Sequence, residues 1–278
     1  MYPGLDPNGV VPFLLVTALL LGGSLRIWLL RRERAPLVRP LLLDSTLVAA
    51  GYVGGKAFFL LTNDGVVAPT WGGVRHPGIL LGAASAAYVS SWVLPRSLSL
   101  ARWADLGAPG AALGLATLRL GCLLAGCCHG GVSSLPWAIQ FPGFSPAWWA
   151  HVERGLITAD RAASLPVHPL QAYFFLVSIA VALGALSLLL RRRPAVEGRV
   201  ALIAVAVHEG AKALLETLRD PQVALLQDAS LCIALAACVG LWLRRAPSYS
   251  RYPSERSAGR SPAPRGVSSE SAGIERSP

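Results

Sequence analysis

Apolar segments close to the length of a bilayer crossing recur along this chain of 278 residues. A helix of about 20 mostly apolar residues can cross the hydrocarbon layer. Seven such segments are present, at about residues 10–30, 42–62, 78–94, 104–127, 168–190, 200–217 and 225–243. Only 14% of the residues are charged, whereas a soluble domain carries roughly a quarter. The sequence therefore predicts an all-α membrane protein, a bundle of about seven transmembrane helices.

Arginine residues are distributed unevenly among the connections between these segments. The connections after the first, third, fifth and seventh segments contain RRERAPLVR, PRSLSLAR, RRRPAVEGR and RRAP. The other connections together hold only Arg75, Arg154, Arg161 and Arg219. Basic residues concentrate in cytoplasmic loops, so the N-terminus is expected outside and the C-terminus in the cytoplasm. The net charge of +10 suits an anionic inner leaflet. Membrane lipids are therefore expected as partners, and nucleic acid is not.

Two parts of the chain differ in composition from the apolar segments. Residues 246–278 are rich in Ser, Pro and Arg, which predicts a disordered cytoplasmic tail after a transmembrane domain of residues 1–245. The longest connection, about 128–167, is called the arm, and it contains Trp137, Phe141, Phe144, Trp148 and Trp149. Amphipathic rings are favoured at the headgroup level of a bilayer. The arm is therefore expected to be partly ordered on the outer face.

Four basic residues lie within the apolar segments, where ionisable groups are costly and often mark functional sites. Arg26 is one turn from the cytoplasmic arginines and is expected to snorkel towards them. Lys56 follows two glycines, which allow a second helix or a ligand to approach the backbone. Lys212 lies four residues before Glu216, so an intrahelical ion pair is an alternative to a functional role.

The fourth basic residue, Arg119, is the strongest candidate for ligand binding. Its helix offers no carboxylate within one turn, so its partner must be another helix or an anionic ligand. Guanidinium binds phosphate bidentately, and the natural phosphate of a membrane is a lipid headgroup. His76 lies on the same side as the expected mouth of this site and is suited to proton transfer. His168 precedes a proline at the start of a segment, which favours a structural role.

Three cysteines and a histidine lie at the outer end of the fourth segment: Cys122, Cys127, Cys128 and His129. Helical spacing predicts that Cys122, Cys127 and His129 converge on one site. The thiols are either small hydrophobic side chains or groups that become oxidised or acylated. The sequence holds no Cys-x-x-Cys pair of a usual zinc set. No metal ion and no cofactor are expected.

Five motifs, in order between about residues 40 and 220, resemble the prolipoprotein diacylglyceryl transferase family of bacterial inner-membrane enzymes. They are DSTLVAAGYVGGKAFFLLTN, GGVRHPG, RLGCLLAGCCHGG, VHPLQAY and AKALLETLRD. The resemblance implies transfer of the diacylglyceryl group of phosphatidylglycerol to the cysteine thiol of a prolipoprotein signal peptide. It also implies a location in the bacterial inner membrane and a central cavity accessible to lipid.

The resemblance also implies roles for individual residues. Arg119 matches the family's essential arginine, His76 the proposed base, and Lys212 stands where the family has a catalytic arginine. Lys56 replaces another family arginine, and Cys122 replaces a signature asparagine. The remaining positions that match the substrate-binding motifs are Gly121, Gly126, Gly130, His168, Gln171, Tyr173, Glu216 and Arg219.

Several positions depart from the family pattern. Cys127 and Phe174 stand where the family has glutamates, and His129 replaces a tryptophan. Lysine keeps the charge of an arginine but loses its two-pronged geometry. An alternative is therefore a divergent, non-transferase member, a thiol-redox or lipid-binding transport protein on the same scaffold. In the family reaction the thiol comes from the acceptor, so these cysteines are not expected to be the nucleophile.

The orientation can be tested by cysteine labelling. In a variant without native cysteines, a cysteine at Ala195 is expected to react with a membrane-impermeant maleimide only after the cytoplasmic side is opened. A cysteine at Ala159, in the arm, is the control and is expected to react in intact cells. Labelling of position 195 from outside would contradict the predicted orientation.

Overall fold

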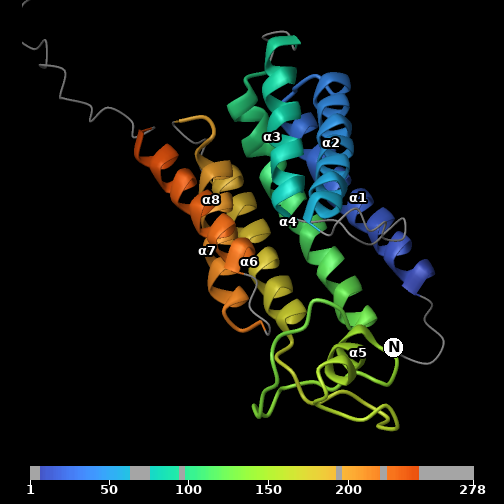
Figure 1. Ribbon diagram of the computed structural model, residues 1–278. Helices are drawn as coiled ribbons and strands as arrows, with labels where there is room; N and C mark the ends of the chain where they lie inside the picture. Colours follow the sequence, from blue (N-terminus) through green and yellow to red (C-terminus); the bar gives the residue numbers. More distant parts are fainter. Residues whose placement is uncertain (1–6, 63–75, 94–97, 192–195, 220–223, 244–278) are drawn as a thin grey trace, which may run out of the picture. The chain divides into compact units, whose positions relative to one another are not determined.

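The computed structural model describes residues 7–62, 76–93, 98–191, 196–219 and 224–243 (Figure 1). The predicted tail, residues 246–278, lies outside this described part. Within it, one helix corresponds to each of the seven predicted apolar segments: α1 (Pro7–Arg32), α2 (Val38–Thr62), α3 (His76–Val93), α4 (Leu100–Ala125), α6 (Leu170–Arg191), α7 (Arg199–Glu216) and α8 (Ala224–Leu243). A short helix that was not predicted, α5 (Pro146–Glu153), lies in the arm.

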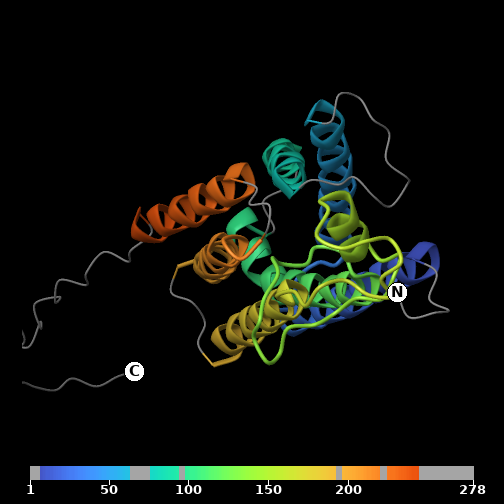
Figure 2. The ribbon, with the colours of Figure 1, turned by 60° about the horizontal axis from the view of Figure 1, so that its bottom comes forward.

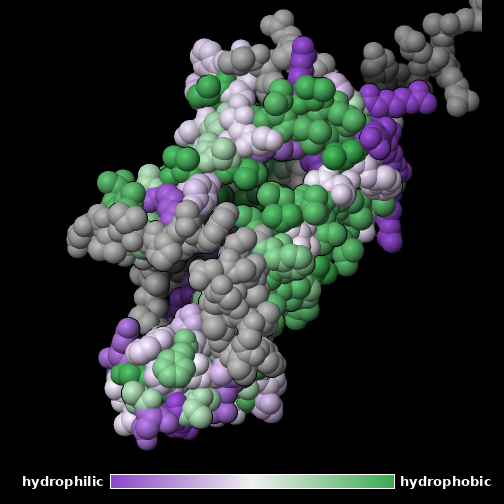
Figure 3. All heavy atoms as spheres, turned by 90° about the vertical axis from the view of Figure 1, so that its right-hand side faces the viewer, coloured by the Kyte–Doolittle hydropathy of each residue, from purple (hydrophilic) through white to green (hydrophobic). Residues whose placement is uncertain are grey.

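The apolar character of these helices confirms the prediction of an all-α membrane protein. Four helices of the described residues are long and apolar enough to cross a bilayer: Phe13–Arg32, Val38–Thr62, Leu100–Ala125 and Leu170–Arg191. Gly78–Ser90 and Asp228–Leu243 are apolar but shorter. Hydrophobic residues cover much of the helical surface in Figure 3, and hydrophilic ones are frequent over the arm at its lower end. The number of crossings, predicted as seven, stays a prediction.

Helices α1 and α4 pack with their backbones in contact. A Cβ atom on Gly22 would lie 2.5 Å from the carbonyl oxygen of Gly110, and one on Gly110 would lie 2.5 Å from that of Gly22. Small residues allow such close helix packing in membranes, where the hydrophobic effect does not drive helices together. Towards the arginine-rich end, α1, α4, α6 and α7 share a core of Leu29, Leu30, Leu106, Ala185, Leu189 and Val200.

Helices α2 and α3 form a second close pair, seen side by side in Figures 1 and 2. A Cβ atom on Gly54 would overlap the carbonyl oxygen of Gly78, and one on Gly82 would overlap that of Ala50. Of the two alternatives for the glycines before Lys56, the close approach of another helix is therefore observed for Gly54.

The expectation that Arg26 snorkels is wrong. Its side chain is only 5% exposed, and its Nε donates to the Asp44 carboxylate of α2 at 2.8 Å. Its Nη1 donates to the carbonyl oxygen of Trp103 in α4 at 2.7 Å, and Gly107 leaves the space it occupies. Arg26 is buried because it finds two partners on neighbouring helices. Removing one partner of such a pair costs about 3–5 kcal/mol.

A second buried polar contact joins α4 to α7. The Asp105 carboxylate, which is fully buried, accepts from the backbone N–H of Gly198 at 2.7 Å and of Ala201 at 2.9 Å. These groups begin α7, where backbone N–H groups have no helical partner and the helix dipole favours an anion. Asp105 therefore fixes the start of α7 on α4.

The arm is folded onto the end of α4. Phe141, Ala147 and Val167 form a small core with Leu123 of α4 against it. Ser145 caps α5 by accepting from the N–H of Trp148. Isolated bridges join Val132 and Ile139 to Val167, and Pro142 to Ala163. The arm is thus an ordered segment with its own small core. Its location at the outer interface stays a prediction.

Two adjacent tryptophans of α5 are expected to behave differently on substitution. Trp148 is 2% exposed and donates from Nε1 to the carbonyl oxygen of Arg161 at 2.7 Å, so Trp148→Ala should destabilise the arm by about 3 kcal/mol or more. Trp149 is 46% exposed, so Trp149→Ala should weaken lipid contact with little loss of stability. Thermal unfolding in detergent and lipid quenching of tryptophan fluorescence measure the two effects. Equal destabilisation by both substitutions would contradict the assignment.

Candidate functional site

The arm meets the end of α7 and the start of α6 through backbone hydrogen bonds of two glycines. Gly130 N–H donates to the carbonyl oxygen of His168 at 2.9 Å, and Gly131 N–H to that of Leu218 at 2.8 Å. A Cβ atom on Gly130 would lie 2.6 Å from the Cβ of His168, so only glycine fits there. These contacts gather predicted residues of α4, α6 and α7 at one place.

Three of the four glycines in the motif RLGCLLAGCCHGG have separate structural roles. Gly121 faces Leu14 of α1. Gly126 ends α4 in the left-handed conformation, with φ of 69°, and its N–H bonds to the carbonyl oxygens of Cys122 and Leu123. Gly130 lies beyond the helix, against His168. The motif therefore encodes a helix contact, a helix end and a loop contact rather than one continuous face.

Arg119 lies on the last turns of α4, half-buried, with its guanidinium carbon 4.5 Å from the centre of the Phe174 ring. This cation–π contact comes from α6. Within the described part of the chain, no carboxylate forms an ion pair with Arg119. Its N–H donors are therefore not used by the protein carboxylates around it.

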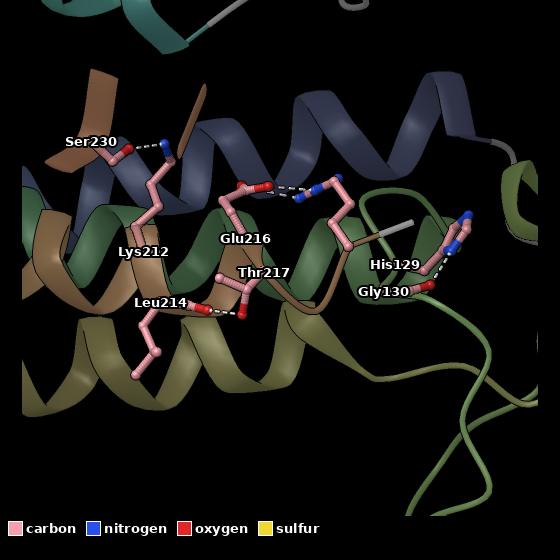
Figure 4. A network of polar contacts seen from close by, with 8 residues as sticks. His129, Gly130, Lys212, Leu214, Glu216, Thr217 and Ser230 are labelled. Atoms are coloured by element: carbon pink, nitrogen blue, oxygen red, sulfur yellow. Dashed lines mark hydrogen bonds and ion pairs between the residues drawn. The ribbon is translucent and has the colours of Figure 1, made fainter. Parts of the chain in front are cut away.

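Lys212 and Glu216 do not form the intrahelical pair considered above. Lys212 is 3% exposed, and its ammonium donates to Ser230 of α8 at 2.5 Å. Glu216 accepts from Arg219 at 2.6 and 3.3 Å. Figure 4 shows Lys212 directed towards Ser230 and Glu216 directed elsewhere. Arg119 is close enough to Lys212 to affect it electrostatically. Three cations thus lie near the end of α7, with Glu216 bound to Arg219 and Glu209 also acting electrostatically on Lys212.

The arm, the start of α6 and the end of α7 meet at a junction, to which the motif VHPLQAY contributes two side chains and one backbone contact. Gln171 is fully buried, and its Nε2 donates to the carbonyl oxygen of Cys127 at 2.6 Å. The Tyr173 hydroxyl accepts from Trp137 Nε1 at 2.7 Å. His168 joins the junction through its backbone, as a structural role predicts, while its buried Nδ1 and the Gln171 Oε1 have no partner among the described residues.

The cysteine cluster differs from its prediction in one member. The Sγ atoms of Cys122, Cys127 and Cys128 all lie within 4.8 Å of one another. His129 is not part of this group, and its Nδ1 lies 2.8 Å from the carbonyl oxygen of Gly130 (Figure 4). Cys128 replaces it because the chain leaves the helix at Gly126 and Cys128 adopts φ of 56°. Helical spacing does not apply beyond that turn.

Lys56 and His76 are placed less fully. Lys56 is half-buried on α2, and its convergence with Arg119 stays a prediction. His76 begins α3, and its side chain lies outside what the structure describes. His208 is buried on α7 with Nδ1 3.0 Å from the Glu209 carboxylate.

The contribution of Ser230 was not predicted. A single serine in the apolar α8 does not indicate a polar contact by itself, because its partner, Lys212, belongs to another helix. Phe174 was singled out only as a departure from the family pattern. Its position in α6 gave no indication that its ring would contact Arg119, because Arg119 belongs to another helix.

Comparison with known proteins identifies sequence relatives of this chain. The family described as prolipoprotein diacylglyceryl transferase matches residues 12–245. A phosphatidylglycerol–prolipoprotein diacylglyceryl transferase of Clostridium tetani is 23% identical over 208 residues, which cover 70% of this chain and 76% of that protein. A second transferase of that description, from Clostridium perfringens, is 29% identical over 145 residues, which cover 49% of this chain and 50% of that protein.

The junction can be tested with one added methyl group. Gly130→Ala should lower the free energy of unfolding by about 1–3 kcal/mol, because the new Cβ overlaps His168 and the backbone cannot give way easily. Gly184→Ala is the matched control, because no atom lies within 4 Å of the position its Cβ would take. Thermal unfolding of both variants in detergent measures the difference. A fully stable Gly130→Ala variant would show that the loop is not packed as described.

Proposed function

Because the chain belongs to the prolipoprotein diacylglyceryl transferase family, we propose that it transfers a diacylglyceryl group from phosphatidylglycerol to the cysteine thiol of a prolipoprotein signal peptide. The thiol loses its proton to a base, and its sulfur bonds to the carbon of the diacylglyceryl group that carries the phosphate. The carbon–oxygen bond to the phosphate breaks, and glycerol phosphate leaves with that electron pair. The products are a thioether and a phosphate monoester, and no redox partner is needed.

The contact of Arg119 with the Phe174 ring is the observation that carries this proposal. The reaction requires cations that hold the headgroup and stabilise negative charge as it develops on the leaving phosphate. Arg119 rests on the Phe174 ring at 4.5 Å, so the ring supports the guanidinium without using its N–H donors. In the proposal these donors bind the phosphate oxygens of phosphatidylglycerol.

Lys212 is proposed to supply a second positive charge. Its contact with Ser230 at 2.5 Å orients the ammonium without neutralising it, and burial strengthens its interaction with an anion. Arg219 would contribute more weakly, because it already binds Glu216. Lys56 is a further proposed contact to the headgroup, as a point charge without bidentate geometry.

The remaining roles follow the family motif. His76 is proposed as the base that accepts the thiol proton. The other substrate-binding residues are proposed to shape the cavity around the headgroup and to hold the charged side chains: Gly121, Cys122, Gly126, Gly130, His168, Gln171, Tyr173 and Glu216. The buried contacts of Gln171 and Glu216 support a positioning role for these two.

We further propose that the protein lies in the bacterial inner membrane, with its N-terminus and arm outside and its C-terminal tail in the cytoplasm. Apolar helices long enough to span a bilayer support a membrane location. Outside is also where signal-peptide cysteines become available for modification. The exposed rings of Trp137 and Trp149 support contact of the arm with lipid headgroups.

The proposal is tested in a bacterium depleted of its own transferase. Expression of this chain should restore thioether-linked lipid on a prolipoprotein, measured by mass spectrometry. Arg119→Lys should reduce the product at least about 100-fold, because one ammonium cannot replace a bidentate guanidinium at a developing charge. The protein should remain inserted and folded.

Two controls make the result specific. Arg191→Lys changes an exposed arginine at the far end of α6 and should keep full activity. Cys127→Ala should keep most of it, because the nucleophilic thiol belongs to the acceptor. An active Arg119→Lys variant together with an inactive Cys127→Ala variant would overturn the family mechanism and favour thiol-redox chemistry.

A further inference from the structure

Three thiols gather beside the proposed lipid site, and the transferase reaction uses none of them. The Sγ atoms of Cys122, Cys127 and Cys128 lie within 4.8 Å of one another, and all three residues are half-buried. None of them forms a disulfide. No fourth His, Cys, Asp or Glu of the described residues belongs to the group. Three sulfur atoms around one ion at about 2.3 Å each would lie about 4 Å apart.

The local fold holds the three thiols together. Gly126 ends α4 with φ of 69°, and Cys128 takes the left-handed conformation with φ of 56°. A residue other than glycine adopts that conformation at a cost in free energy, which contacts with the surrounding structure must offset. Gln171, fully buried, binds the carbonyl oxygen of Cys127 at 2.6 Å. The loop is therefore held from α6 in the turn that directs Cys128 back towards Cys122.

The guanidinium groups of Arg119 and Arg219 lie close enough to Cys128 to act on it electrostatically. Metals bind the thiolate form of cysteine, and a positive charge nearby stabilises a thiolate.

From this geometry we propose that Cys122, Cys127 and Cys128 form a binding site for a single copper(I) ion. Thiolate ligands select soft ions, among them copper(I) and zinc(II). Structural zinc is almost always four-coordinate, whereas copper(I) is satisfied by three thiolates, the number that the cluster offers. Each thiol that is still protonated releases its proton when the ion binds, and no electron is transferred. The site shares Cys122 with the residues proposed to shape the lipid cavity, but its test does not depend on transferase activity. It departs from the expectation, drawn from the sequence, that no metal is bound.

The test uses the full chain, reduced and free of oxygen, in lipid nanodiscs. One equivalent of copper(I) is added in the presence of a competing copper(I) chelator, and the metal retained per chain is measured after desalting. One ion per chain is expected for the native protein. The variants Cys122→Ser, Cys127→Ser and Cys128→Ser should each weaken retention at least about 10-fold. The double variant Cys232→Ser/Cys238→Ser, on the exposed cysteines of α8, is the matched control and should retain one ion.

A second measurement does not depend on variants. Copper(I) should protect Cys122, Cys127 and Cys128 of the native protein from alkylation, read by peptide mass spectrometry, while Cys232 and Cys238 stay reactive. Full alkylation of the cluster in the presence of the ion, or copper retention that persists without Cys127, would overturn the proposal. Zinc(II) retained in preference to copper(I) in a parallel sample would overturn the three-coordinate assignment.

Discussion

Buried polar contacts made by α4 are the constraint on which the rest of the bundle depends. In a bilayer, a polar group without a partner costs several kcal/mol, because no water is present to replace that partner. One end of α4 accepts from Arg26 and caps α7 with Asp105. Its other end carries Arg119 and leads into the arm. The same helix therefore determines where α1 and α7 lie and where the charged groups of the site meet.

The positions of the helices could be predicted from the sequence because length and hydrophobicity are local properties. The contacts of single polar residues could not, because they depend on which helices become neighbours. Arg26 was expected to reach solvent, yet Asp44, in the next apolar segment, binds it. Lys212 had a candidate partner one turn away in Glu216, yet it binds Ser230 on α8. In both cases the prediction from neighbouring residues in the sequence was wrong, because the actual partner belongs to another helix.

Other differences arise where the helical repeat ends. Cys122 and Cys127 were predicted to converge, and they do. His129 was expected to join them, but the left-handed turn at Gly126 rotates the following residues and brings Cys128 in instead. Burial of the arm was equally unpredictable, since Trp148 and Trp149 are identical residues side by side. One is 2% and the other 46% exposed, and the buried one donates from its Nε1 to the carbonyl oxygen of Arg161.

The contact between Arg119 and the Phe174 ring has a consequence for how the site responds to acidity. A glutamate below the guanidinium would gain a proton as the pH falls, and the arginine would then lose its support. The Phe174 ring, 4.5 Å from the guanidinium carbon, has no proton to gain or lose. Acidification therefore does not change the group on which the guanidinium lies.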